Sequence, residues 1–521
     1  MSGHEGDRGN GGSHDGGGRD GGFDDGRRNA AGRQRSASRS RGGDRSRTSQ
    51  APSERRKRTD PARMAAFDVL REVDESDAYA NLVLPPLLRE RHVRGRDAGF
   101  ATELTYGTLR LRGRYDAILA TCVDRPLPGL DPALLDVLRL GAHQVLGMRV
   151  PVHAAVSETV GLARNRVGAG PAQMVNAVLR RVSQRSLDEW LAVLTGEAPD
   201  ALSGLAATES HPMWIARALR EALAGNGRDV GEIGDLLAAD NASPRVTLVA
   251  RPGLVDVADE AAWGDVDLVA GRWAPTALRL EGSDPSGIPA VREGLAGVQD
   301  EGSQLVTLAL ADTPVDGRDE RWLDLCAGPG GKAALLAALA GQRGATLVAN
   351  EVAPHRARLV EKTLAALPDG VVEEVRTGDG REVGADEPGA YDRVLVDAPC
   401  TGLGALRRRP ESRWRRTPAD LAALTTLQRE LLASALDAVR PGGVVAYVTC
   451  SPHLAETQLV VSDVLKKRDD VERLDTPATV RSVVRAGGGD DIPLSDRDDV
   501  QLWPHVHGTD AMHLTLLRRT A

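Results

Sequence analysis

From about residue 301 onward, the sequence alternates between short apolar stretches and longer amphipathic ones. Stretches such as GKAALLAALA and DLAALTTLQRELLASALDAV are typical of helices, and the apolar runs between them are typical of buried strands. Near-continuous apolar strands separated by helices predict a doubly wound parallel α/β sheet of the Rossmann-like kind. The expected strands are RWLDLC, TLVANEV, VEEVRTGD, DRVLVDAP and VVAYVTC, and VQLWPHVHGTDAMHLTLLRR is expected to add two final strands.

The rest of the chain divides by composition and periodicity. A length of 521 residues predicts two to four domains. Helical patterns with almost no β-branched alternation begin at TDPARMAAFDVLREV, where Thr59 or Asp60 can cap a helix and Pro61 occupies its first turn. We therefore predict a multidomain protein with these parts: a basic Arg/Gly/Ser-rich tail at 1–58, an all-α domain at 59–185, a helical linker at 186–240, a small α/β subdomain at 241–300 and a catalytic α/β domain at 301–521.

The tail differs in charge from the body. Residues 1–58 hold 14 basic and 8 acidic residues, whereas the whole chain has a net charge of −8. A segment such as RQRSASRSRGGDRSR has too little apolar surface to offset its ordering entropy, so disorder is expected. A solubilising tail and a non-specific RNA tether are both consistent with this composition.

Several classes of protein are disfavoured. The N-terminus has no apolar segment typical of a secretory signal, and no apolar run reaches the length of a membrane span. The four cysteines, Cys122, Cys326, Cys400 and Cys450, are far apart and form no CxxC pair. This spacing argues against a disulfide framework or a cysteine-rich zinc site and predicts a cytoplasmic protein without a metal.

A glycine-rich loop follows the first predicted strand, in LDLCAGPGGKAALL. It is not a Walker A loop, because Cys326 stands where that motif has its first glycine and Ala333 follows Lys332 in place of Ser or Thr. Gly328, Gly330 and Ala333 do match the dinucleotide pattern GxGxxA, which is a weak signal alone. Glycines directly before a helix N-terminus let the backbone approach a ligand closely.

Acidic residues end the next three strands, at Glu351, Asp379 and Asp397. In a doubly wound sheet, ligands bind beyond the carboxyl ends of the strands. Three such acids suit a ligand with ribose hydroxyls, an adenine amino group and an α-ammonium, which is S-adenosylmethionine. Each acid alone could instead be a cap, and a nicotinamide oxidoreductase is the alternative that GxGxxA and Glu351 permit.

Two cysteines also lie at this edge. Cys400 follows the fourth strand in DAPCTGLG, and Cys450 ends the fifth in YVTCSP. Because cysteine is among the most buried residue types, Cys122 is expected to be core packing and Cys326 a structural part of the cofactor loop. Cys400 and Cys450 are candidates for chemistry, although the residues alone do not rank one above the other.

Three of these motifs, LDLCAGPGGK, DAPCTGLG and YVTCSP, occur in an order that resembles the NOL1/NOP2/Sun family of RNA cytosine-5 methyltransferases, and GVQDEGSQL resembles the family's lead-in. The resemblance covers residues 241–521. ARMAAFDVLREV and GRDAGFATELTYGTLR are similar to NusB, an RNA-binding fold. Together they imply a NusB-like all-α domain joined to a class I S-adenosylmethionine-dependent methyltransferase domain, a layout found in 16S rRNA methyltransferases.

The resemblance also implies roles. Cys450 would be the nucleophile, Cys400 would assist product release, and Asp397 and Lys332 are hypothesised to steer the base and to neutralise charge. The implied S-adenosylmethionine contacts are Cys326, Ala327, Gly328, Pro329, Gly330, Gly331, Lys332, Glu351, Arg356, Asp379 and Asp397. The expected substrate is RNA, with 16S rRNA favoured over tRNA, and the expected protein is a monomer. A non-catalytic ribosome-assembly factor is the alternative from another class.

The segment RRRPESRWRR follows the second cysteine and places arginines around a tryptophan. That composition favours phosphate contact and base stacking, and a solvated charged loop is the alternative. The predicted RNA contacts are Arg407, Arg408, Arg409, Arg413, Trp414, Arg415 and Arg416. One departure from the family is HGTDAMHL, which replaces the usual Asp-Gly-Phe-Phe-like stretch near the end of the chain.

Overall fold

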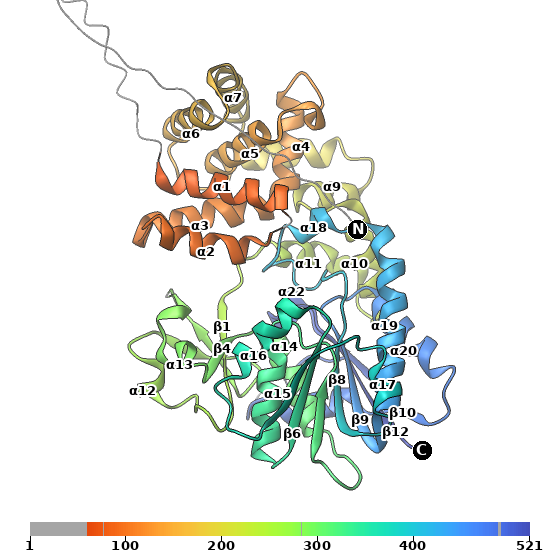
Figure 1. The fold of residues 1–521 in the computed structure, drawn as a ribbon. Helices are drawn as coiled ribbons and strands as arrows, with labels where there is room; N and C mark the ends of the chain where they lie inside the picture. Colours follow the sequence, from red (N-terminus) through yellow and green to blue (C-terminus); the bar gives the residue numbers. More distant parts are fainter. Residues whose placement is uncertain (1–59, 77, 283, 488–490) are drawn as a thin grey trace, which may run out of the picture. The chain divides into compact units, whose positions relative to one another are not determined.

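The computed structural model describes residues 60–76, 78–282, 284–487 and 491–521. The predicted tail at 1–58 lies outside these described residues. None of the helices in the described part of the chain has both the length and the apolar character that a membrane span requires. Figure 1 shows helices in the first half of the described chain and a large sheet with helices on both faces in the second.

The N-terminal helices begin where the sequence predicts. The Asp60 carboxylate accepts hydrogen bonds from the backbone N–H groups of Ala62 and Arg63 at 2.8 and 3.2 Å, so it caps the first helix directly before Pro61. Seven helices enclose one apolar core that also contains Cys122, as predicted. They are α1 (Pro61–Ser76), α2 (Ala80–Glu90), α3 (Gly95–Arg110), α4 (Arg112–Cys122), α5 (Pro132–Leu146), α6 (Val152–Arg166) and α7 (Ala169–Val182).

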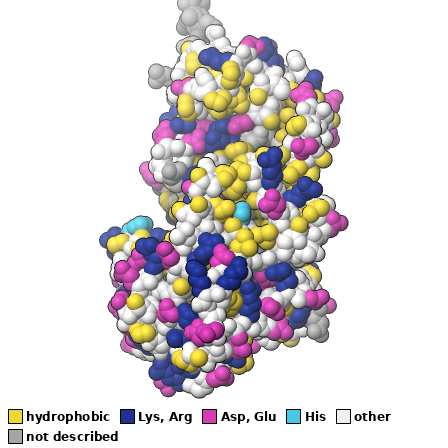
Figure 2. Space-filling model, turned by 90° about the vertical axis from the view of Figure 1, so that its right-hand side faces the viewer, with side chains coloured by type: hydrophobic (Ala, Val, Ile, Leu, Met, Phe, Trp, Pro, Cys, Tyr) yellow, Lys and Arg dark blue, Asp and Glu magenta, His cyan; other side chains and the backbone are white. Residues whose placement is uncertain are grey.

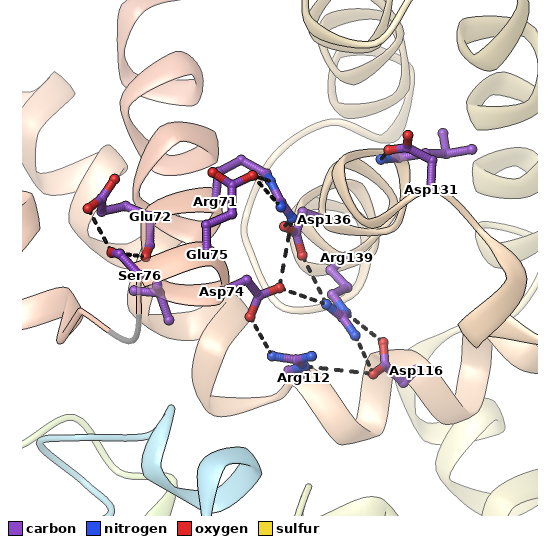
Figure 3. A network of polar contacts seen from close by, with 12 residues as sticks. Arg71, Glu72, Asp74, Glu75, Ser76, Arg112, Asp116, Asp131, Asp136 and Arg139 are labelled. Carbon is purple, nitrogen blue, oxygen red and sulfur yellow. Dashed lines mark hydrogen bonds and ion pairs between the residues drawn. The ribbon is translucent and has the colours of Figure 1, made fainter.

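An ionic network joins α1, α4 and α5 within this domain (Figure 3). The guanidinium of Arg139 binds both carboxylate oxygens of Asp116 at 2.7 Å and Asp136 at 2.9 Å. Arg71 reaches Asp136 from α1 at 2.7 Å. Because Asp136 and Arg139 are almost fully buried, each charge depends on its partners, and the network fixes how the three helices pack.

Four further helices lead from this domain to the catalytic one. The apolar faces of the last three form a core with Leu403, Leu406 and Trp503, which belong to the catalytic domain, whereas the first packs through Trp190 and Leu194 in the core of the N-terminal domain. The linker is therefore packed against that domain and is not a loose connection. Its helices are α8 (Leu187–Gly196), α9 (Ala201–Thr208), α10 (Met213–Gly225) and α11 (Ile233–Asp240).

A small antiparallel sheet follows, with the order β2-β3-β1-β4. Two of its strands, β1 (Val246–Ala250) and β3 (Ala277–Leu280), lie in the stretches PRVTLVARPG and GRWAPTALRLEG of the predicted small α/β subdomain. The sequence patterns did not indicate the short strands β2 (Leu268–Ala270) and β4 (Ala296–Val298). Two helical turns, α12 (Glu260–Trp263) and α13 (Pro289–Arg292), pack beside it.

The large sheet has the order β10-β12-β9-β8-β5-β6-β7, with β11 paired to β12. All five predicted parallel strands are present, and the two final strands are also found. The sheet is mixed, however, because β12 runs antiparallel to β9, β10 and β11. A wholly parallel sheet would need a crossover before each strand, and β11 is followed by β12 after only a short connection. The strands are β5 (Arg321–Asp324), β6 (Thr346–Glu351), β7 (Val372–Thr377), β8 (Tyr391–Asp397), β9 (Val439–Thr449), β10 (Val471–Arg473), β11 (Asp499–Gln501) and β12 (His513–Arg519).

Successive side chains of each central strand are buried on opposite faces of the sheet. Leu395 contributes to the core under α14 and α15, whereas Val394 and Val396 contribute to the core under α19 and α20. This two-sided burial explains why the strands read as continuous apolar runs. The helices of this domain are α14 (Glu301–Asp312), α15 (Gly331–Gln342), α16 (Pro354–Leu364), α17 (Val383–Asp386), α18 (Ser412–Arg415), α19 (Pro418–Ala438), α20 (Gln458–Leu465), α21 (Thr476–Val483) and α22 (Pro504–His507).

Candidate active site

The glycine-rich loop lies between β5 and α15, where the strand order reverses next to β8. Gly328 and Gly330 have φ angles of +59° and +96°, which favour glycine. A Cβ added at Gly330 would lie 2.9 Å from the Cβ of Thr363, so the loop also needs glycine for close packing. The loop therefore presents bare backbone at the switch point, where doubly wound sheets bind their ligands.

Glu351 at the end of β6 holds this loop from the side. Its carboxylate accepts the backbone N–H of Gly328 at 3.0 Å and that of Ala353 at 3.0 Å. The guanidinium of Arg356 lies 3.4 Å away. Asp379 follows the end of β7 by two residues and is bound to Arg381 at 2.6 Å, an ion pair that lowers the pKa of the Asp379 carboxyl.

Asp324, the last residue of β5, is a site residue that our sequence reasoning missed. Its side chain is fully buried, and one of its carboxylate oxygens has no hydrogen-bond partner among the described residues. Burial and the nearby Asp397 carboxylate raise its pKa to about 8. Its position at a strand end in LDLC was the available signal. A buried acid with an unused oxygen and acidic neighbours suits a site that receives a cation.

Lys332 and Asp397 form the boundary between the loop and the cysteines. Lys332 Nζ donates to Asp397 Oδ2 at 2.8 Å. Burial disfavours the charge on Lys332, but the Asp397 carboxylate outweighs it, and the pKa of the lysine is raised. Lys332 therefore stays cationic in the interior, within electrostatic reach of Cys450.

The two candidate cysteines lie together, with Cys400 Sγ 3.4 Å from Cys450 Sγ. They are inequivalent in charge. A hydrogen bond from Cys400, with help from Lys332, lowers the pKa of the Cys450 thiol despite its burial. The hydrogen bond to Cys450 and burial raise the pKa of Cys400 well above its ordinary value. The arrangement thus favours a thiolate on Cys450 and a protonated thiol on Cys400.

Glu456 ties the two cysteine-bearing loops together, and no sequence signal pointed to it. Its fully buried carboxylate accepts the backbone N–H of Thr401 at 2.7 Å and also the Thr401 hydroxyl. Gln428 donates to the same carboxylate at 3.1 Å. The Gly404 N–H donates to the Cys450 carbonyl at 2.9 Å. Glu456 is therefore a positioning residue that fixes Cys400 relative to Cys450.

A second buried cluster lies beside Cys450 and contains Asp300, Asp510, Arg407 and Arg408. Asp510 accepts from Arg408 at 2.8 Å, and its own N–H donates to Asp300 at 3.0 Å. Burial and the neighbouring Asp510 raise the pKa of Asp300 to about 6. The unusual stretch HGTDAMHL thus supplies Asp510, which joins the last strand to the Cys400 loop.

The arginine-rich segment is mostly bound within the protein, contrary to the expectation that it lies open to RNA. Arg413 is fully buried and donates to the carbonyls of Arg110, Ser210 and Asp240 and to Asn241 Oδ1, at 2.7–3.2 Å. It is therefore not available as a phosphate contact. Arg407 and Arg408 are held by Asp510, as described above.

Trp414, Arg415 and Arg416 line a cavity of about 450 Å³ against the N-terminal domain. Arg409 and Arg415 stack on the ring of Tyr79 at 4.9 and 5.2 Å, and Arg112 lies 5.9 Å from the ring of Trp414. On the face drawn in Figure 2, basic side chains are interspersed with acidic ones over the lower half of the molecule. Of the predicted RNA contacts, Arg409, Trp414, Arg415 and Arg416 stay predictions.

Two family models match the chain. The model described as 16S rRNA methyltransferase RsmB/F matches residues 311–518, and the model of the NusB family matches residues 60–184. The first contains β5 to β12 and both cysteine loops. The second contains the helices α1–α7.

Known proteins resemble the chain over most of its length. Rv1407 of Mycobacterium tuberculosis, which is named as a methyltransferase, is 52% identical over 91% of this chain and 99% of its own. Ribosomal RNA small subunit methyltransferase B of Escherichia coli is 31% identical over 79% of this chain and 91% of its own. The crystal structure of PH0851 has the same fold, with a TM-score of 0.71 at 21% identity, and covers 88% of this chain and 98% of that one. The chain therefore belongs to the RsmB/F family of methyltransferases and carries an N-terminal domain of the NusB family.

Proposed function

We propose that this protein transfers a methyl group from S-adenosylmethionine to carbon 5 of a cytosine in 16S rRNA, through a covalent cysteine–cytosine intermediate. The observation that carries the proposal is the pair Cys400 and Cys450, 3.4 Å apart beside the Lys332–Asp397 ion pair. A single thiol would serve as packing, but two inequivalent thiols at the edge of a cofactor loop suit covalent catalysis. The names of the RsmB-type relatives support rRNA over tRNA as the substrate.

The residues at the switch point fit S-adenosylmethionine. The unused oxygen of buried Asp324 and the bare backbone of Gly328 and Gly330 leave a place for a cationic ligand close to the loop. Glu351 and Asp379 would hold the ribose and adenine ends, and Arg356 would keep Glu351 in place. When bound, S-adenosylmethionine supplies an electrophilic methyl group on a sulfonium.

The protein's own residues prepare the cytosine. Carbon 5 of cytosine is a poor nucleophile, and addition of the Cys450 thiolate to carbon 6 makes it enamine-like. The hydrogen bond from Cys400 and the charge of Lys332 favour the thiolate of Cys450 before attack. After methylation, a base removes the proton on carbon 5 and Cys450 leaves. Cysteine suits both steps because its thiolate attacks readily and also leaves readily.

We assign Cys400 and Asp397 to the second half of the reaction. Cys400 keeps its proton near neutral pH and donates a hydrogen bond to Cys450, so it can assist departure of that sulfur. Asp397 lies at the end of the strand that leads to Cys400 and is bound by Lys332. We assign Asp397 the task of orienting the base that takes the carbon 5 proton. The target base must leave any helical stack to reach these groups.

The proposed function is tested by bisulfite sequencing of RNA from a strain that lacks this protein. One 16S rRNA cytosine that is protected in the parent strain is expected to become convertible, and the purified protein should restore protection on unmodified rRNA. Loss of protection at a tRNA cytosine, with 16S rRNA unchanged, would identify tRNA as the substrate in place of 16S rRNA. Unchanged protection in both RNAs, with no methyl transfer in vitro, would favour a non-catalytic assembly factor.

Affinity for S-adenosylmethionine is expected to rise as pH increases from 6 to 7.5. The pKa of Asp324 is about 8 without a ligand, so its carboxyl is neutral over this range. A cationic ligand favours the carboxylate, and binding therefore releases a proton, with affinity rising by up to about tenfold per pH unit. The α-ammonium of the ligand remains mostly charged below about pH 7.5. Calorimetry in two buffers of different ionisation enthalpy measures the released proton.

Two variants test whether Asp324 is the group that causes this pH dependence. Asp324→Asn is expected to bind with an affinity that no longer changes over this range, because the titrating group is gone. Asp379→Asn should bind more weakly but keep the pH slope, since the pKa of Asp379 is already low. Equal slopes in the wild type and in Asp324→Asn would show that another group titrates.

A further inference from the structure

A cavity of about 550 Å³ lies beside the cofactor loop, on the side away from Glu351 and the cysteines. It is lined on one side by the small sheet, including Arg251 and Gln299, and on the other by Pro329, Gly331 and the end of α16. Figure 1 draws the small sheet next to α16. Neither Glu351 nor Asp324 lines this cavity, and of the residues expected to contact the cofactor only Pro329 and Gly331 do.

Arg251 brings a buried cation to the wall of the cavity. Arg251 is 4% exposed, and it forms no ion pair with any described carboxylate. One guanidinium nitrogen donates to the carbonyls of Gly294 and Thr363, the latter at 3.1 Å, and Nε has no partner among the described residues. Burial lowers the pKa of Arg251 to about 10, so the guanidinium stays charged at neutral pH. A buried charge without a counter-ion is costly unless a ligand supplies one.

Gln299 adds unused polar atoms to the same wall. It is 8% exposed, and neither its amide nitrogen nor its amide oxygen has a hydrogen-bond partner within the described chain. Such buried, unpaired groups are rare in folded proteins and call for an explanation. Gly297 leaves room next to the guanidinium, because a Cβ there would lie 3.3 Å from Arg251 Nη2.

The charges around the opening favour an anion. Lys362 and Arg292 are exposed on its lining, and Glu293 is its one acidic lining residue. Gly331 begins α15, a helix of 12 residues whose N-terminal end carries a partial positive charge. The cavity thus combines a buried arginine, exposed basic residues and a helix end, which is a set suited to a phosphate group.

We propose that this cavity binds a backbone phosphate of the substrate RNA, with Arg251 as its buried contact and Lys362 at its rim. The inference rests on the proposed function, because it takes RNA as the substrate. A phosphate seated here, next to the cofactor loop, would help to fix the register of the strand whose base enters the site. Contacts of this kind position the strand without reading its sequence.

The test uses the full chain and an unmodified 16S rRNA fragment, with the dissociation constant measured by filter binding at several salt concentrations. Arg251→Gln is expected to weaken RNA binding about tenfold at 0.1 M salt and to reduce the slope of log Kd against log salt by about one. Arg251→Lys should restore most of that slope. The matched control is Arg245→Gln. Arg245 directly precedes β1 of the same small sheet and pairs with Glu281 at the surface.

Two outcomes would contradict the proposal. Equal affinity and salt slope in Arg251→Gln and Arg245→Gln would overturn it, and so would weaker S-adenosylmethionine binding with unchanged RNA binding. If Arg251→Gln does not fold, as judged by its melting temperature, Lys362→Gln decides, with a reduced slope expected. RNA binding is read without methylation, so a failure of the proposed reaction would be seen separately.

Discussion

A Cys450→Ala variant is expected to lose methyl transfer by at least about 10⁴-fold, the usual scale for removal of a covalent nucleophile. Without the thiolate, carbon 5 of cytosine stays unreactive towards the methyl donor. S-adenosylmethionine binding should remain, because the loop and Glu351 are untouched. The measurement is transfer of radiolabelled methyl to unmodified 16S rRNA under single-turnover conditions.

The partner variant separates the two thiols. Cys400→Ala is expected to attack but to release the product slowly, so that a covalent RNA–protein adduct accumulates on a denaturing gel. Cys122→Ala is the control, since that cysteine is buried in the N-terminal helical domain, and it should form no excess adduct. The roles would be reversed if Cys450→Ala still formed an adduct with RNA containing 5-fluorocytosine while Cys400→Ala did not.

Arg413→Ala is expected to destabilise the protein by about 3–5 kcal/mol. The buried guanidinium joins α18 to the carbonyls of Arg110, Ser210 and Asp240, which belong to the N-terminal domain and the linker. Its removal leaves these carbonyls buried without donors and opens a cavity between the segments.

The effect is measured as the shift of the urea midpoint and of the melting temperature. Arg409→Ala is the matched control, because Arg409 is exposed in the same segment and its loss should change stability by less than about 0.5 kcal/mol. If Arg413→Ala left the melting temperature unchanged but weakened RNA binding, Arg413 would be an RNA contact and not a structural residue.

Local patterns determined much of the fold. The apolar runs placed β5, β6, β8 and β9, because strands buried on both faces must be apolar throughout, whereas the edge strand β7 is polar and partly exposed. The glycines of the cofactor loop and the Asp60–Pro61 helix start follow from backbone chemistry that is readable from a few residues. The strand β12 was predicted, but its antiparallel direction was not, because pairing direction depends on how the chain returns to the sheet.

The sequence by itself placed Cys400 and Cys450 at one edge of the sheet, since the carboxyl ends of neighbouring parallel strands meet there. Only the tertiary structure brought their sulfurs to 3.4 Å and put Lys332 near one of them, which makes the two thiols inequivalent. It also turned Arg413 inward and gave Glu456 its partner Thr401, 55 residues away. Local periodicity fixes strands and loops, but contacts between distant segments decide which charge is buried, which partner it meets and therefore what it does.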